Sequence, residues 1–173
     1  MKVGSVLFAA VFGVLLSYVE AVLGCPAATA FTLFDKAKKK IGNGTIVLGS
    51  GVMKAHLHTS ASNASTSTLS LHSSVSSEVT QANGYLSAGK SLAALAWTVG
   101  ASAAQYKFDA TDPIWTASGG TIPNIKFFVL RTSLNASTGH LLCWSRLTTA
   151  QFTLGSGNTL TVQFNASGIF TLA

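Results

Sequence analysis

Apolar and polar side chains alternate with a period of two in several short stretches of this 173-residue chain. In residues 53–58 the apolar side chains fall on odd positions, and lysine or histidine falls on the even ones. The same alternation recurs in residues 104–109, 152–154 and 160–164. Because successive side chains of a strand point to opposite faces of its sheet, this pattern predicts half-buried β-strands.

Two further stretches, residues 125–130 and 141–147, are apolar at most positions, which is typical of central strands covered on both faces. Eight or so short strands at this spacing predict an all-β fold, namely an antiparallel β-sandwich or jelly-roll-like domain. Turn signals separate these strands at Asn83-Gly84, Gly119-Gly120, Thr138-Gly139 and Gly155 to Asn158.

One short amphipathic helix is expected before the strands. Thr32 and Asp35 have the spacing of a capping box, and Gly42 is a natural stop. We therefore expect a helix over residues 33–41, with its apolar face against the body of the domain. Its polar face carries four lysines, which are candidate interaction residues: Lys36, Lys38, Lys39 and Lys40.

The first thirty residues form an apolar leader. Lys2 precedes a long apolar run, and the small residues Ala28-Thr29-Ala30 end it, as in a secretory signal peptide. The run is also just long enough for a marginal membrane helix, and a retained N-terminal arm or an upstream extension is an open alternative. The chain thus divides into a leader, residues 1–30, and one domain, residues 31–173. A membrane is a partner only if the leader is a real signal or anchor.

Charged residues make up 9% of the chain, against roughly 25% in an ordinary soluble domain. Disorder requires low hydrophobicity or high charge, so this composition excludes it. The net charge is +6, but the lysine cluster has no interleaved aromatic residues on which bases could stack, which disfavours nucleic acid as a partner. The two cysteines, Cys25 and Cys143, are too few for a disulfide framework or a zinc site. A surface of Ser, Thr, Asn and Gly is typical of a domain that works against another protein.

The residue types needed for catalysis occur without a catalytic arrangement. Asp109 and Asp112 are close in sequence, but Asp112 precedes Pro113 in a pair that commonly begins a turn. The chain has no serine nucleophile elbow, phosphate loop or zinc-protease motif. The sequence therefore predicts a protein that is not an enzyme and needs no cofactor.

Two histidines, His56 and His58, share one face of a predicted strand, a spacing that suits a metal pair. A metal site needs a third ligand, from His72, His140 or a carboxylate, and the sequence fixes none of them. We interpret the pair as histidines on a polar strand face and predict no metal site.

A low-complexity Ser/Thr tract occupies residues 59–77. Leu69 and Leu71 alternate within it, so part of the tract is expected to be an edge strand. The rest is expected to be a long surface loop, where binding modules often place their contacts.

Several segments of residues 31–173 resemble small structural proteins of tailed bacteriophages. The resemblance is clearest in residues 108–117, which read FDATDPIWTA and precede Gly119-Gly120. It extends to residues 41–46, residues 52–60, Glu78-Val79, Gly84-Tyr85, residues 89–92 and residues 157–165. These motifs are structural and not catalytic.

The resemblance implies a virion component, and a head decoration or cement protein in particular. Such a protein binds the major capsid protein, forms homo-oligomers on the particle and is located on the capsid surface. Trp115 and Trp144 are candidate anchors for this contact if they are exposed, and core residues if they are not. Two alternatives remain open: a tail or receptor-binding component, and a secreted or lipid-anchored surface module.

Overall fold

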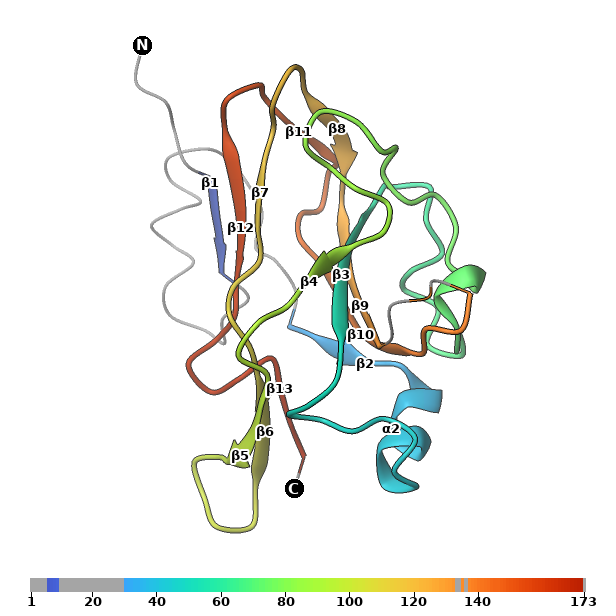
Figure 1. The fold of residues 1–173 in the computed structure, drawn as a ribbon, viewed down its shortest axis with the longest axis vertical. Helices are drawn as coiled ribbons and strands as arrows, with labels where there is room; N and C mark the ends of the chain where they lie inside the picture. The colour runs from blue at the N-terminus through green and yellow to red at the C-terminus, as the bar shows by residue number, and fades with distance from the viewer. Residues whose placement is uncertain (1–5, 10–29, 133–134, 136, 173) are drawn as a thin grey trace.

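The computed structural model describes residues 6–9, 30–132, 135 and 137–172 (Figure 1). In this part of the chain the fold is all-β with one α-helix, α2 (Asp35–Gly42), which confirms the predicted class. The strands form four sheets, ordered β1-β12-β7, β2-β10-β9-β3-β4, β11-β8 and β13-β6-β5. The strand bounds are β1 Val6–Ala9, β2 Thr32–Leu33, β3 Met53–His58, β4 Lys90–Ser91, β5 Ala96–Val99, β6 Tyr106–Asp109, β7 Ile114–Thr116, β8 Ile122–Ile125, β9 Phe127–Thr132, β10 Leu141–Arg146, β11 Phe152–Leu154, β12 Thr159–Gln163 and β13 Phe170–Leu172.

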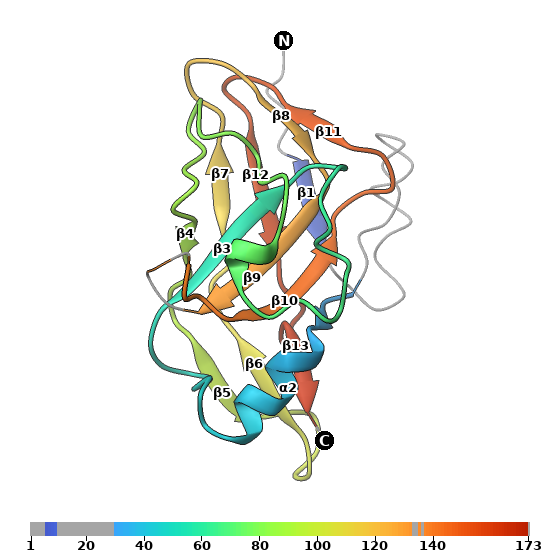
Figure 2. The same cartoon turned by 90° about the vertical axis from the view of Figure 1, so that its right-hand side faces the viewer.

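The five-stranded sheet is the centre of the fold. Its long strands β3, β9 and β10 pair antiparallel, and the β1-β12-β7 sheet lies behind them in Figure 2 and beside them in Figure 1. Phe128 of β9 connects the two layers. Its ring packs edge-on against Trp115 of β7, with 6.3 Å between centroids, and against Phe164, with 6.2 Å. The fold is therefore sandwich-like, with the apolar core between these two sheets.

The opposite face of the five-stranded sheet is covered as well. Residues 59–89 run across it with little regular structure apart from the 3-10 helix η1 (His72–Ser74), and α2 packs beside β10 (Figure 2). The prediction that His56 and His58 lie on a polar strand face is wrong, because both side chains are fully buried under this segment. The Ser/Thr tract folds back onto the five-stranded sheet. It thereby buries the sheet face that carries His56 and His58.

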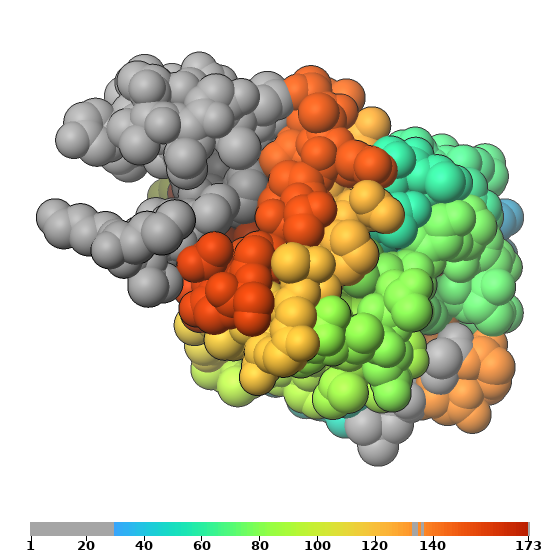
Figure 3. All heavy atoms as spheres, turned by 90° about the horizontal axis from the view of Figure 1, so that it is seen from above, coloured from blue at the N-terminus to red at the C-terminus, as the bar shows by residue number. Residues whose placement is uncertain are grey.

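Residues 59–89 belong to the body of the molecule. Seen from the end that carries β8 and β11, the green part of this segment lies in one continuous surface with the yellow chain before β8 and the orange-red chain around β11 (Figure 3). The edge strand expected within residues 59–77 does not form, and Leu71 makes only an isolated bridge with His140.

The predicted helix exists, but its predicted cap is wrong. α2 begins at Asp35 with Phe34 as its N-cap, and no side chain caps it. Thr32 instead belongs to β2, opposite Trp144. The Asp35 amide donates to the Ser67 carbonyl at 3.0 Å, and the Ser67 hydroxyl donates to Asp35 Oδ2 at 2.7 Å. A tertiary partner from residues 59–89 therefore replaces the local capping box.

Of the predicted leader, residues 1–30, the structure describes only residues 6–9 and 30. Val6–Ala9 form β1, which pairs in parallel with β12. The signal-peptide and anchor predictions depend on residues outside the described part, and they stay predictions. Within the described ranges, no helix has the length and apolar character that crossing a membrane requires.

Candidate functional site

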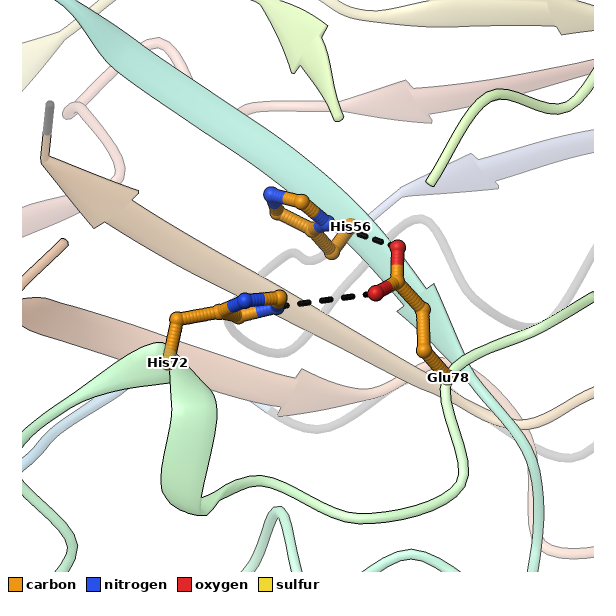
Figure 4. A group of neighbouring side chains, drawn as sticks. All are labelled: His56, His72 and Glu78. Atoms are coloured by element: carbon orange, nitrogen blue, oxygen red, sulfur yellow. Dashed lines mark hydrogen bonds and ion pairs between the residues drawn. The ribbon is translucent and has the colours of Figure 1, made fainter. Parts of the chain in front are cut away.

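Three polar side chains from separate segments meet on the covered face of β3 (Figure 4). His56 comes from β3, His72 from η1, and Glu78 from the chain beyond η1, which bridges back to β3. His56 Nδ1 lies 2.8 Å from Glu78 Oε1, and His72 Nε2 lies 4.0 Å from Glu78 Oε2. The two imidazole rings are 4.0 Å apart between centroids. Together with Tyr85 and Arg131, these residues are called the buried polar cluster below.

Arg131 fixes the tautomer of His56. Its Nε–H donates to His56 Nε2 at 2.8 Å, so that nitrogen must be an acceptor. The proton of the neutral imidazole is then on Nδ1, which donates to Glu78 Oε1. The result is a continuous hydrogen-bonded chain from the guanidinium through the imidazole to the carboxyl group.

Tyr85 completes this chain on the carboxyl side. Its hydroxyl donates to Glu78 Oε1 at 2.6 Å and accepts a hydrogen bond from the Leu57 amide at 3.1 Å. Burial, together with the neighbouring Glu78 carboxylate, holds the pKa of Tyr85 far above its usual range. The tyrosine is therefore a fixed hydrogen-bond donor at neutral pH. It ties the chain around residue 85 to the middle of β3.

Burial also keeps the histidines of this region neutral. It lowers the pKa of His56 and of His72 to about 3, and that of His58 to about 4. For His56 the positive charge of Arg131 adds to the effect of burial. The contact between His56 and Glu78 is therefore a hydrogen bond from a neutral imidazole at neutral pH, and not an ion pair.

His56, His72 and Glu78 each offer one ligand atom, and these atoms lie within 4.8 Å of one another, as a metal site would require. The sequence left this third ligand open. However, a metal on His56 Nδ1 would force the ring proton onto Nε2, where it would face the Nε–H of Arg131. Only His72 and Glu78 would then remain as ligands, fewer than the three or four protein ligands of a typical zinc site. The hydrogen bonds thus oppose a metal at this position.

The geometry also opposes nucleophilic catalysis near His58. Ser62 Oγ lies 3.5 Å from His58 Nδ1, which is loose for a nucleophile and its base. That nitrogen lies 3.1 Å from the Ser76 carbonyl and donates to it, so it cannot accept the Ser62 proton. Asp112, one of the two carboxylates considered for acid–base chemistry, accepts the Phe164 amide at 2.7 Å. These candidate groups are occupied by structural hydrogen bonds.

The backbone of Gly89 packs directly against the His56 ring of the buried polar cluster. It has φ of +76°, and a Cβ on it would overlap the His56 imidazole. We expect Gly89→Ala to lower the free energy of unfolding by about 2–3 kcal/mol, through backbone strain and overpacking. Urea denaturation measures this loss.

Gly51→Ala is the matched control for this prediction. Gly51 also has a positive φ, +84°, but nothing lies within 4 Å of its Cβ position. Its replacement should cost only about 1 kcal/mol of backbone strain. Equal losses for the two variants would contradict close packing of Gly89 on His56.

The predicted lysine cluster is divided by the fold. Lys40 turns inward, where its Nζ donates to Ser70 Oγ at 3.1 Å and lies 2.6 Å from His140 Nδ1. The side chain of Lys40 is therefore occupied by contacts within the molecule, and His140 contacts Lys40. The lysines that remain exposed on α2 are Lys36, Lys38 and Lys39.

The two candidate tryptophan anchors differ in exposure. Trp115 is only 3% exposed, and its ring packs against Phe128 between the two layers. The condition for an anchor is therefore not met at Trp115, and the alternative expectation, a core residue, holds. Trp144 is half-buried on β10 and packs edge-on against Phe127, with 6.2 Å between centroids. It stays a candidate anchor.

Sequence reasoning did not find Glu78, Tyr85 or Arg131 as members of one site. The available signal is Arg131, which directly follows residues 125–130, the stretch predicted to be a central strand. A charged residue at such a position requires buried partners. Its partners are far away in the sequence, so the signal predicts that a site exists without naming its other members.

The fold and the buried polar cluster thus define a compact all-β module that buries His56, His58, His72 and Arg131. No protein-family model, curated protein or solved structure matches this chain.

Proposed function

We propose that this chain is a non-enzymatic virion structural protein that decorates the capsid of a tailed bacteriophage by binding the major capsid protein. Two observations support the proposal besides the resemblance of residues 31–173. Within the buried polar cluster, internal hydrogen bonds join Arg131, His56, Glu78 and Tyr85. Large apolar side chains, in contrast, are left on the outside. The latter observation carries the proposal, because neighbouring exposed apolar side chains mark a protein contact.

Among the described residues, five large apolar side chains are exposed, and two of them face each other on the hairpin of β5 and β6. This hairpin projects at the lower end of the molecule (Figure 1). Val99 is 54% exposed and Tyr106 is 45% exposed, and the two residues are opposite each other in the hairpin. The half-buried Trp97 ring stacks on Tyr106, with 5.7 Å between centroids. The backbone of Gly49 packs on Trp97, which brings the neighbouring loop against the hairpin.

Positive charge lies at the same end. Both Figure 1 and Figure 2 place α2 at the end of the molecule that carries the β5–β6 hairpin. Three exposed lysines of α2 therefore accompany the apolar hairpin: Lys36, Lys38 and Lys39. This combination suits a partner surface with an apolar depression and an acidic border, because complementary charges steer the encounter and fix its orientation.

A weak contact of this kind is sufficient on a particle. A stable protein–protein interface buries roughly 1,200–2,000 Å² in total, and symmetry-related copies add their contacts without each one being tight. We call Val99, Tyr106, Trp97 and the exposed lysines of α2 the docking end.

The docking end predicts the effect of a double substitution. We expect Val99→Ser with Tyr106→Ser to reduce the number of copies bound per particle at least tenfold, because both side chains lose apolar contact with the capsid. Quantitative mass spectrometry of washed particles measures the copy number. Both positions are exposed, so thermal unfolding should show an intact fold.

Leu86→Ser is the matched control for the docking end. Leu86 is 60% exposed, but it lies beside Lys90 and Trp115 and not on the hairpin. Its replacement should leave the copy number unchanged. Loss of binding in this variant alone would place the contact elsewhere.

The proposal as a whole is tested on purified virions. Mass spectrometry should find the chain in washed particles, and immunogold labelling should place it on the head. Labelling of the tail would indicate a tail component instead. A chain cleaved after Ala30 or before Cys25 and absent from particles would indicate a secreted or lipid-anchored module.

A further inference from the structure

The edge strands of the sheets are short. Among the described residues, the edge strands β1, β2, β4, β5, β7, β8, β11 and β13 have two to four residues each. Short edges prevent unwanted strand pairing between molecules. β12 has five residues, more than any other strand outside the central sheet, and one side of it pairs with β7. Its other side would be the longest open edge of the molecule if β1 did not cover it.

β1 covers this edge with four apolar residues. It runs parallel to β12, with Val6 opposite Leu160 and Ala9 opposite Gln163. β12 is its only strand partner in the described part of the chain. Pairing of this kind depends on backbone hydrogen bonds, which any extended segment of suitable shape can make.

Residues 10–29 connect β1 to the rest of the chain. Twenty residues span at most roughly 70 Å when fully extended. A domain of the size of residues 31–173 is roughly 40 Å across. The connection is therefore long enough for β1 to reach the β12 edge of an adjacent molecule.

We propose that the outer edge of β12 is a strand-accepting site, and that on an assembled particle it binds Val6–Ala9 of a neighbouring copy. The pairing is the same within one chain and between two chains, so the local concentration of copies decides which one forms. Copies held side by side on a surface favour exchange, and exchange links each copy to the next. This inference deepens the proposed function, because it requires neighbouring copies.

A cysteine pair in register tests the exchange. Leu7 is opposite Thr161 in the parallel pairing. Chains with Leu7→Cys are mixed with chains carrying Thr161→Cys, with Cys25→Ser in both, and are oxidised at rising protein concentration and on particles. We expect a covalent heterodimer whose yield increases at least tenfold from dilute solution to the particle.

The control uses a pair inside the body. Thr116 and Thr159 are opposite each other in β7 and β12. The double variant Thr116→Cys with Thr159→Cys should form a bond within one chain, and the mixed single variants should form no heterodimer.

Three results would overturn the exchange. The first is a bond within a single chain that carries both Leu7→Cys and Thr161→Cys, with no heterodimer on particles. The second is no bond of either kind, and the third is a mature chain that lacks residues 6–9. Particles that carry the protein without heterodimers would reject the exchange and leave the proposed function intact.

Discussion

Replacing Arg131 with methionine should lower the free energy of unfolding by about 3–5 kcal/mol. Arg131 is fully buried, and its guanidinium donates to His56 Nε2 at 2.8 Å, to the Ala88 carbonyl at 3.3 Å and to the Asn135 carbonyl at 3.2 Å. Methionine fills much of the same volume but donates no hydrogen bond. The loss therefore comes from buried acceptors without donors and from the missing charge opposite Glu78. Urea unfolding measures it.

Lys90→Met is the matched control for Arg131→Met. It removes a positive charge from an exposed side chain of β4 in the same sheet, and it should change stability by no more than about 0.5 kcal/mol. A double-mutant cycle with Glu78→Gln should show a coupling of about 1–3 kcal/mol, because the two residues belong to one hydrogen-bonded chain. Stability equal to that of the natural chain in Arg131→Met would contradict the structural role of the buried polar cluster.

Lowering the pH from 7 to 5 should destabilise the fold by about 2 kcal/mol for each buried histidine. The unfolded imidazole has a pKa near 6.5, whereas burial holds that of His56 and His72 at about 3 and that of His58 at about 4. The unfolded chain therefore binds protons first. The stability that the neutral histidines contribute is fully present above pH 6.5 and is lost as the pH falls toward 3. Urea midpoints at a series of pH values measure the slope.

His72→Phe provides the comparison for this pH dependence. It removes one buried imidazole, so the loss between pH 7 and pH 5 should become smaller by about 2 kcal/mol. His140→Gln should change the slope less, because His140 is only half-buried beside Lys40. Restricting the range to pH 5 and above keeps most carboxyl groups out of the titration. A flat stability profile over this range would show that the histidines are not buried in the neutral form.

The alternation of side chains predicts the strands well. Residues 53–58, 152–154 and 160–164 all contain strands where the period-two pattern places them, and residues 141–147 contain the central strand β10. The pattern cannot say what covers each face, because that depends on a segment with no pattern of its own. The Ser/Thr tract lacks strand periodicity, yet it packs on β3 and buries His56 and His58.

The buried polar cluster illustrates the same limit. His56 meets Glu78 from 22 residues away and Arg131 from 75 residues away. Residues so far apart in the sequence form no motif with a fixed spacing. They are brought together by the tertiary fold, including the register of the sheet, and not by the local geometry of one helix or turn. Only Arg131 could be singled out in the sequence, as a charge inside an apolar strand.

The order of strands in the central sheet has a consequence for how the chain is made. β2 pairs with β10, more than one hundred residues later, and β3 pairs with β9, about seventy residues later. During synthesis, β3 leaves the ribosome long before its long partner β9 exists. The sheet can close only after β10 has emerged, so we expect its folding to be slow and to finish late in synthesis or after it.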